Sequence, residues 1–459
     1  MDPLTFSVEL EAVYFFTLGP VDIYNDPHLA PVVDMSPQGN PDFTMHDYGR
    51  WDDTKAEMIR RVSCAIENCL CGLPQSCRGE VASLEGDPVL SRYQDWKVET
   101  NKATVIRDPE PRPEYEGLWK LDLEVQSPMM YATEGSFKEV EAVANMLRAS
   151  FRAAVPPCCE MRVLVGAGSN LVPFPIFIRI AAICWAVDRF LQQMHPISRH
   201  YNRWHGARRQ TARLDQAEAV EEAEQVKAIP VEKQDIPILE YVNRARPKRL
   251  STEFKRTLSR NDFNLILFQE RNICLGPYRP YLPGRPLTRI DRPNILQGAI
   301  QLFGCRSYGA VAYLINHNSL GVYNFNYYSD ENTEYKDPKA TVEFCTAAGS
   351  LDGHWVSTHA RICTGIAQFA ASAAEENVWR MIYECHDADM EGTEYDLIDL
   401  LLDLGLAKEA ETVQYRFKMN RNTGEPFRTF LSSDAITYED GVADGNHETD
   451  RATHSGRAR

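Results

Sequence analysis

The sequence predicts an α+β fold built on a mostly antiparallel sheet. Strand-like and helix-like stretches follow one another in no regular alternation, which is typical of this class rather than of parallel α/β folds. The chain of 459 residues is 44% hydrophobic and 25% charged, which is enough apolar material for a substantial core. The first clear element, residues 6–16, has the two-residue period of a strand.

The remaining elements in the first half of the chain are predicted from the spacing of their apolar residues. They are a helix over residues 53–70 and strands over 96–105 and 119–125. A second, amphipathic helix is predicted over 136–151, where Ser136 is a plausible N-cap and Glu139 stands at capping-box spacing.

The second half predicts more helix than strand. Residues 161–165 form a short apolar strand, and residues 173–194 form the most apolar helix of the chain. Strand-like segments are expected within 308–328, and a further strand at 340–344. The last predicted elements are helices over 358–374 and 373–386, which could form one continuous element, and a Leu-rich helix over 397–410.

The composition predicts one large domain over residues 1–431. A charged insertion is expected near 205–290, where residues 214–228 are rich in Ala and Glu. Residues 432–459 are polar and lack large apolar side chains, so a disordered tail is expected.

The charge and the apolar pattern limit the kinds of partner. A formal net charge of −16 argues against binding to nucleic acid or to an anionic membrane, because phosphate surfaces need clustered Lys and Arg. The longest apolar stretch, 171–191, is interrupted by Arg179, Asp188 and Arg189, so it predicts a buried helix rather than a membrane span. No signal-peptide pattern occurs, and we expect a cytoplasmic protein whose twelve cysteines are thiols.

Four glutamates stand in strand-like contexts and are the candidate metal ligands. Glu9 and Glu11 are two residues apart, so both project from one face of a strand. Together with Glu124 and Glu343 on neighbouring strands they would offer the oxygen ligands that Mg²⁺ prefers. The same alternation describes any half-exposed strand, and each pattern taken alone leaves that interpretation open. Phosphate-binding glycine loops and the G-x-S-x-G elbow of hydrolases are both missing from the sequence.

Five motifs in a fixed order add to this pattern. They are Ser7-Val8-Glu9-Leu10-Glu11, Glu124-Val125-Gln126-Ser127-Pro128, Glu134-Gly135, the His-Pro-Ile-Ser-Arg-His-Tyr-Asn run of residues 195–202, and the stretch Thr341 to Asp352. In these motifs the chain resembles the amidoligase family of fungi and bacteria, within the carboxylate–amine ligase group related to glutamine synthetase. The resemblance covers roughly residues 5 to 370.

The resemblance implies a fold and an activity. The fold is a glutamine-synthetase-like curved antiparallel sheet that forms a half-barrel with helices packed outside. The activity is ATP-dependent joining of a small-molecule or peptide carboxylate to an amine through an acyl phosphate, and related ligases often form homo-oligomers. ATP and Mg²⁺ are the implied cofactors, with Glu9, Glu11, Glu124 and Glu343 as metal ligands.

The resemblance also assigns roles to further residues. Glu9, Glu343 and Arg199 are the implied catalytic residues. Arg199 and Asn202 would support the nucleotide or the wall of the site, and a purely structural role for that motif stays open.

Three positions depart from the family pattern. Leu164 and Gly166 stand where the family has two histidines, and Cys345 stands where it has an arginine. A guanidinium at a phosphoryl-transfer site stabilises the transition state, and a cysteine supplies no such charge. The sequence therefore predicts either a ligase with a partly degraded site or a catalytically inactive binding or scaffold protein. A hydrolase derived from the ligase cleft is a third reading, and Cys345 is a conceivable nucleophile.

Overall fold

The structure is a computed structural model, and it describes most of residues 3–195 and most of residues 295–423. The described residues are 3–18, 29–35, 48–82, 94–100, 117–156, 159–168, 170–195, 295–315, 323–325, 328, 341–390 and 393–423. Arg199 and Asn202, the expected insertion near 205–290 and the expected tail 432–459 all lie outside these residues.

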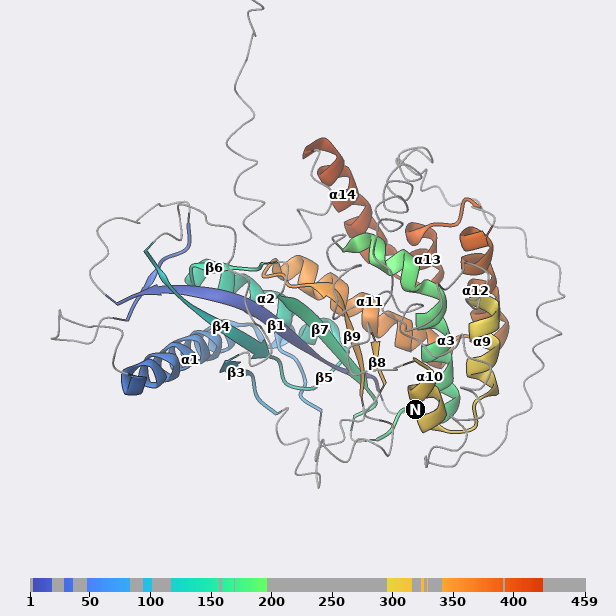
Figure 1. Ribbon diagram of the computed structural model, residues 1–459, viewed down its shortest axis with the longest axis horizontal. Coiled ribbons are helices and arrows are strands. Elements are labelled where there is room, and N and C mark those ends of the chain that lie inside the picture. Colours follow the sequence, from blue (N-terminus) through green and yellow to red (C-terminus); the bar gives the residue numbers. More distant parts are fainter. Residues whose placement is uncertain are drawn as a thin grey trace, which may run out of the picture.

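An open, mostly antiparallel sheet forms the centre of the fold (Figure 1). Its main strands, in spatial order, are β3 (Lys97–Thr100), β4 (Trp119–Gln126), β1 (Thr5–Thr17), β7 (Glu160–Gly166), β9 (Thr341–Ala348) and β8 (Tyr323–Asn324). Short strands β2 (Val33–Asp34), β5 (Met130–Tyr131) and β6 (Ala153–Ala154) also pair with β1, of which only β2 is parallel. The predicted α+β class with an antiparallel sheet is confirmed at this level.

One face of the sheet is covered by helices. These are α1 (Tyr48–Gly72), α2 (Glu134–Ser150) and α11 (Gly353–Ser372), and the short 3-10 turn η1 (Gln75–Cys77) packs beside α2. The even-numbered side chains of β1 point towards this layer, where Phe6 stacks on Phe137 of α2 at 4.6 Å between ring centroids. Tyr14 contacts Phe151 edge to face just beyond the end of α2. The odd-numbered side chains, which include Glu9 and Glu11, therefore lie on the opposite face.

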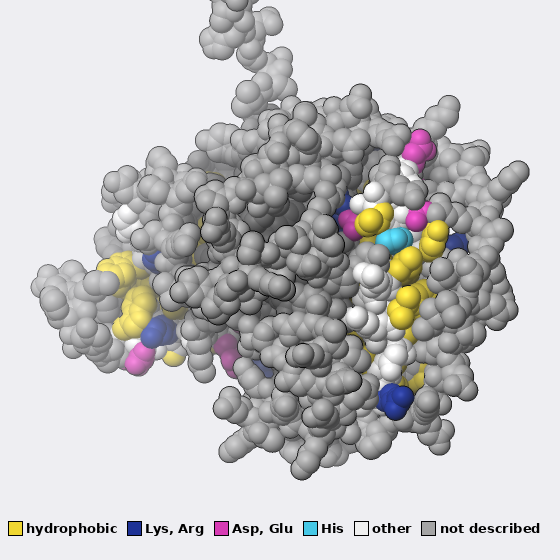
Figure 2. Space-filling model, turned by 45° about the vertical axis from the view of Figure 1, so that its right-hand side comes forward, with side chains coloured by type: hydrophobic (Ala, Val, Ile, Leu, Met, Phe, Trp, Pro, Cys, Tyr) yellow, Lys and Arg dark blue, Asp and Glu magenta, His cyan; other side chains and the backbone are white. Residues whose placement is uncertain are grey.

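A second group of helices packs around the apolar helix α3 (Phe174–Leu191), at the right of Figure 1. It comprises η4 (Gln192–Met194), α9 (Ile295–Gly304), α10 (Tyr308–Ile315), α12 (Glu375–Met390), α13 (Leu397–Asp403) and α14 (Ala407–Thr423). Figure 2 turns this side forward, and hydrophobic side chains are visible among its described atoms, in keeping with the exposure of Ile300 on α9 and Met390 on α12. Scattered exposed side chains of this kind are normal on protein surfaces.

Several predicted elements are corrected by the structure. Strand-like segments were expected within 308–328, but residues 308–315 form α10, and among the described residues of that range only 323–324 pair as a strand. The predicted helix 397–410 is two helices, because Gly405 takes a positive φ of 79° between them. The two helices predicted over 358–386 are confirmed as α11 and α12, and they do not form the single continuous element that was the alternative. The N-cap of α2 is Thr133, whose side chain accepts from the backbone N–H of Ser136, and not Ser136 itself.

Among the described residues, no helix has the length and apolar character needed to cross a bilayer. The described cysteines are free thiols, as expected.

Candidate functional site

The strand order brings the four predicted glutamates onto one face of the sheet. Pairing of β1 with β4 sets Glu11 opposite Glu124, and pairing of β1 with β7 sets Glu9 opposite Arg162. On the next strand, Glu343 of β9 lies opposite Leu164 of β7. Because side chains alternate across a strand and paired residues share a face, all of these project from the side away from α2. We call Glu9, Glu11, Glu124, Arg162 and Glu343 the acidic face.

A guanidinium that the sequence analysis did not single out lies at the centre of the acidic face. Arg162 donates from Nη1 to Glu9 Oε2 at 3.1 Å and from Nη2 to Glu11 Oε1 at 2.6 Å. Its Nε donates to Glu160 Oε2 at 3.2 Å, so three carboxylates surround one cation. Burial disfavours this charge, but Glu9 and Glu11 outweigh that effect and raise the pKa of Arg162.

The remaining oxygens of Glu9 and Glu11 also accept hydrogen bonds within the protein. Gln126 Nε2 donates to Glu9 Oε1 at 3.1 Å, and the backbone N–H of Glu160 donates to Glu11 Oε2 at 3.0 Å. Glu9 and Glu11 are only 4% and 3% exposed. Buried carboxylates are tolerated only when they are paired and hydrogen-bonded, and these two meet that condition entirely from within the fold.

Mg²⁺ does not fit Glu9 and Glu11 in this arrangement. A magnesium ion shared by the two carboxylates would bind their oxygens at about 2.0–2.1 Å, in the position that the Arg162 guanidinium holds between them. All four oxygens of this pair already receive N–H donors. Consistent with this, the part of the chain that the structure describes contains no group of three or more His, Cys, Asp or Glu side chains arranged to hold a metal.

Glu343 and Cys345 form the β9 side of the acidic face. Glu343 Oε2 accepts a hydrogen bond from Asn324 Nδ2 of β8 at 2.9 Å. Burial is the main cause that raises the pKa of the Cys345 thiol well above its usual range, and the charge of Glu343 adds to it. Since the thiolate is the nucleophilic form, this environment disfavours the suggested role of Cys345 as a nucleophile.

Leu164 and Gly166, which stand where the amidoligase pattern has histidines, contribute no polar side chain to the acidic face. Leu164 is fully buried and packs in a small apolar cluster with Ala82 and Met129. Gly166 is the last residue of β7 and pairs with Thr341 and Thr5 through the backbone ladder. Neither residue can ligate a metal or donate a side-chain hydrogen bond.

Ser7 and Ser127, from the first two motifs, hold β1 against the end of β4. The Ser7 hydroxyl donates to the Ser127 carbonyl at 2.8 Å, and the Val8 backbone N–H donates to Ser127 Oγ at 2.9 Å. Both serines are fully buried. These contacts fix the register that places Glu11 opposite Glu124, so their role is structural.

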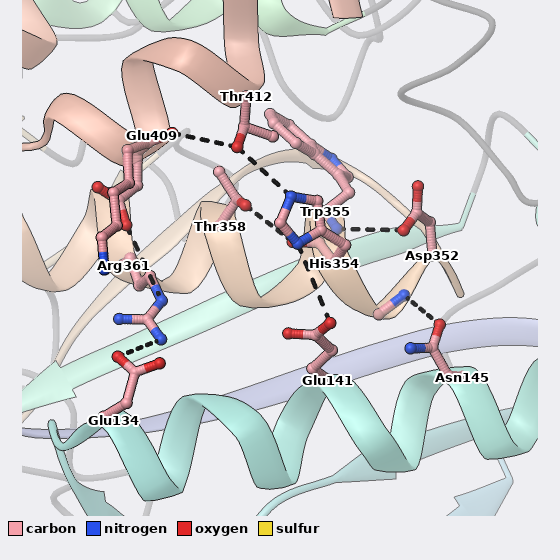
Figure 3. Close-up of polar contacts among 12 residues, drawn as sticks. Glu134, Glu141, Asn145, Asp352, His354, Trp355, Thr358, Arg361, Glu409 and Thr412 are labelled. Atoms are coloured by element: carbon pink, nitrogen blue, oxygen red, sulfur yellow. Dashed lines mark hydrogen bonds and ion pairs between the residues drawn. The ribbon is translucent and has the colours of Figure 1, made fainter. Parts of the chain in front are cut away.

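The Glu-Gly motif and the end of the last motif meet between α2, α11 and α14 (Figure 3). Glu134 pairs with Arg361 of α11 at 2.8 Å, and Asp352 caps α11 by accepting from the backbone N–H of Trp355 at 3.2 Å. The backbone N–H of Gly353 donates to Asn145 Oδ1 of α2 at 3.0 Å. Glu134 and the Asp352 end of the last motif therefore join helices on the covered face, whereas Glu343 of that last motif lies on the acidic face.

His195 opens the fourth motif and is the only part of it within the described residues. It is 1% exposed and its ring lies edge to face against His359, with 5.4 Å between ring centroids. Burial lowers the pKa of His359 to about 4, so this histidine is neutral at neutral pH.

Glu124 of the acidic face has a raised pKa. Burial is the largest cause that raises its pKa from 4.5 to about 7, and the nearby charge of Glu9 adds to the rise while Arg162 opposes it. A neighbouring residue on the same strand, Asp122, has its pKa raised to about 6 by burial. Half-buried carboxylic acids of this kind keep a proton well above the pH at which exposed ones lose it.

We expect the stability of the protein to fall as pH rises from about 4.5 to about 7, because of Glu124. The folded protein keeps this proton up to about pH 7, whereas the unfolded chain releases it near pH 4.5. The Glu124→Gln variant should lack this dependence and gain on the order of 2 kcal/mol relative to wild type across that window. Urea unfolding of both proteins from pH 4.5 to 8 measures it. As a comparison, the difference in stability between Asp122→Asn and wild type should change with pH only up to about pH 6. A stability curve of Glu124→Gln that stays parallel to that of wild type over the whole pH range would contradict the prediction.

Comparison with protein-family models, with curated proteins and with solved structures finds no match to this chain. The amidoligase resemblance therefore remains a prediction from the motifs.

Proposed function

We propose that this protein is a catalytically inactive member of the ligase-like class, in which the fold serves as a binding or scaffold protein. The observation that carries the proposal is the state of Glu9 and Glu11, whose four carboxylate oxygens all accept hydrogen bonds from the protein itself. A nucleotide-dependent ligase needs such oxygens for metal ions that neutralise the phosphates. Here a guanidinium of the same chain already neutralises them.

The other members of the site support the same reading. Cys345 supplies no positive charge, and Leu164 and Gly166 supply no ligand. Glu343 accepts a hydrogen bond from Asn324, which orients its carboxylate along the sheet. The glutamine-synthetase-like half-barrel, a cytoplasmic location and self-association belong to the proposal, and the open antiparallel sheet is compatible with the first of these.

A second candidate is the ATP-dependent carboxylate–amine ligase itself, acting on small-molecule or peptide substrates. One observation favours it: glutamates from β1, β4 and β9, predicted separately from motifs, do lie on one face of one sheet. This candidate requires Arg162 to leave Glu9 and Glu11 when the substrates bind. Its residues would have to include groups beyond the described part of the chain, such as Arg199 and Asn202.

Calorimetric titration of ATP into the purified protein, with and without Mg²⁺, separates the two candidates. We expect no binding heat in either case, because among the described residues Arg162, the cation of the acidic face, is already paired with Glu9 and Glu11, which leaves that pair closed to Mg²⁺. The Glu343→Gln variant should behave as wild type does.

Metal-dependent ATP binding that is lost in Glu343→Gln would instead support the ligase. Glu411→Gln, on the exposed surface of α14 and far from the sheet, is the matched control for a lost carboxylate. Amine-dependent release of ADP by the wild-type protein would refute the proposed function outright.

A further inference from the structure

We infer that Arg162 is the built-in cation of the acidic face: its guanidinium holds the position between Glu9 and Glu11 that a divalent metal ion would take, and its removal opens a divalent-cation site. The inference rests on the proposed function, because it names the residue that closes the face to metal. It concerns a property that the wild-type protein lacks and a single substitution restores.

The geometry of the contacts is that of a bridging cation. Two terminal nitrogens of one planar group reach one oxygen each of Glu9 and Glu11, at 3.1 and 2.6 Å. The third nitrogen reaches Glu160 at 3.2 Å, from the same strand as Arg162. Oxygens from three carboxylates thus converge on one group, and carboxylate oxygens are also what hard divalent cations bind.

The carboxylates are held in place independently of Arg162. The backbone N–H of Glu160 fixes one oxygen of Glu11, and the Gln126 side chain fixes one oxygen of Glu9. Both glutamates also stand on the central strand of the sheet, which is paired along both edges. Loss of the guanidinium should therefore leave the oxygens that faced it pointing at the same position.

The charges of the surrounding side chains determine which kind of group would then bind between Glu9 and Glu11. Arg162 is the one cation that contacts Glu9, Glu11 and Glu160 within the described residues. Glu343 adds negative charge nearby, since it contributes to the field on Cys345. Loss of Arg162 would remove one positive charge from among three carboxylates, which favours uptake of a compact cation or a proton there.

The test is the response of the thermal unfolding midpoint to Mg²⁺ and Mn²⁺, with calorimetry on the same samples. Wild type should show no specific shift at millimolar metal. The Arg162→Gln variant should gain a midpoint that rises with metal concentration, by several degrees once the metal exceeds its dissociation constant about 100-fold. Adding Glu9→Gln to Arg162→Gln should weaken that response at least tenfold.

Two controls separate the inference from a general effect of losing an arginine. Arg361→Gln removes a guanidinium of nearly equal exposure, 23% against 25%, that also pairs with two glutamates, Glu134 and Glu409. It should give no metal response, because Glu134 is 58% exposed and Glu409 lies 3.9 Å from the guanidinium, so the two carboxylates do not form a buried pair around it. Arg162→Lys keeps a cation in place and should also give none.

The outcomes bear separately on this inference and on the proposed function. Equal metal responses in wild type and Arg162→Gln, or in Arg162→Gln and Arg361→Gln, would overturn the inference. If Arg162→Gln does not fold, the titration of wild type with Mg²⁺ gives the answer. A rise of the wild-type unfolding midpoint with Mg²⁺ that is lost in Glu9→Gln would overturn the inference. A wild-type midpoint that does not respond to Mg²⁺ would support it. Binding of ATP by wild type together with a metal gain in Arg162→Gln would contradict the proposed function while keeping this inference.

Discussion

Replacing Asp352 by Ala is expected to cost roughly 3–5 kcal/mol of the free energy of unfolding. The carboxylate pairs with Arg416 of α14, and both side chains are buried, at 8% and 7% exposed. Removing Asp352 deletes a counter-charge from a buried guanidinium, which is the costly part. The loss of the N-cap of α11 adds about 1 kcal/mol.

Chemical denaturation of Asp352→Ala against wild type measures this loss. Asp352→Asn keeps an acceptor for the cap but not the charge, so it should lie between the two. The matched control is Glu141→Gln, because Glu141 makes only an exposed 4.0 Å contact with His354 in the same region (Figure 3). Exposed pairs contribute about 0–1 kcal/mol, and a loss in Asp352→Ala no larger than in this control would refute the role of the buried pair.

Trp185→Ala is expected to cost roughly 3–5 kcal/mol, because it empties the centre of the second helix group. Trp185 of α3 is fully buried and its Nε1 donates to the Ile295 carbonyl of α9 at 3.2 Å. Gly298 of α9 lies directly against the indole, since a Cβ built there would come within 2.2 Å of Trp185 Nε1. The small residue and the large one therefore fill one space between the two helices.

A double-mutant cycle tests this interpretation more sharply than either single change. Gly298→Ala alone should cost roughly 1–3 kcal/mol, because the indole cannot move aside within a packed core. In the Trp185→Ala background the same change should be neutral or stabilising by up to about 1 kcal/mol, since Ala favours a helix over Gly. Denaturation midpoints of the four proteins give the coupling, and additive effects would show that the two residues do not share the space.

The elements with the strongest periodicity could be predicted from the sequence. Residues 6–16 lie within β1 and residues 173–194 cover α3 with η4, and in both the local pattern and the buried surface agree. Residues 308–315 could not be predicted in this way, because their Tyr, Val and Ile content favours a strand. They fold as α10 since Tyr308 packs against Phe174 and Phe177 of α3, and such contacts override local propensity.

The candidate site was predicted in part. Alternation placed Glu9 and Glu11 on one face, and the motifs added Glu124 and Glu343, which the strand pairings bring to that same face. The role of Arg162 could not be predicted, because it depends on a contact with Glu9, which is 153 residues away in the sequence, and no local pattern indicates such a contact. The one available signal was Arg162 itself, a charged residue within the apolar strand predicted over 161–165.

Glu139 illustrates the same difficulty on the helix side. Its position in the sequence indicated a capping box, but its carboxylate accepts from the Gly79 backbone N–H at 2.7 Å and from Trp96 Nε1 at 2.9 Å. Both donors are distant in sequence. The spacing of Ser136 and Glu139 was consistent with a local capping role, but in the folded protein Glu139 makes long-range hydrogen bonds instead.

The central position of β1 has a consequence for how the protein is made. During synthesis this strand leaves the ribosome before its partners exist, because Gln126 follows Glu9 by 117 residues and Arg162 follows it by 153. Until both have emerged, Glu9 and Glu11 remain hydrated and the apolar side of β1 has no sheet to complete. Such long-range pairing slows folding, and the contacts of Glu9 and Glu11 can form only after β7, which ends at Gly166, has been synthesised.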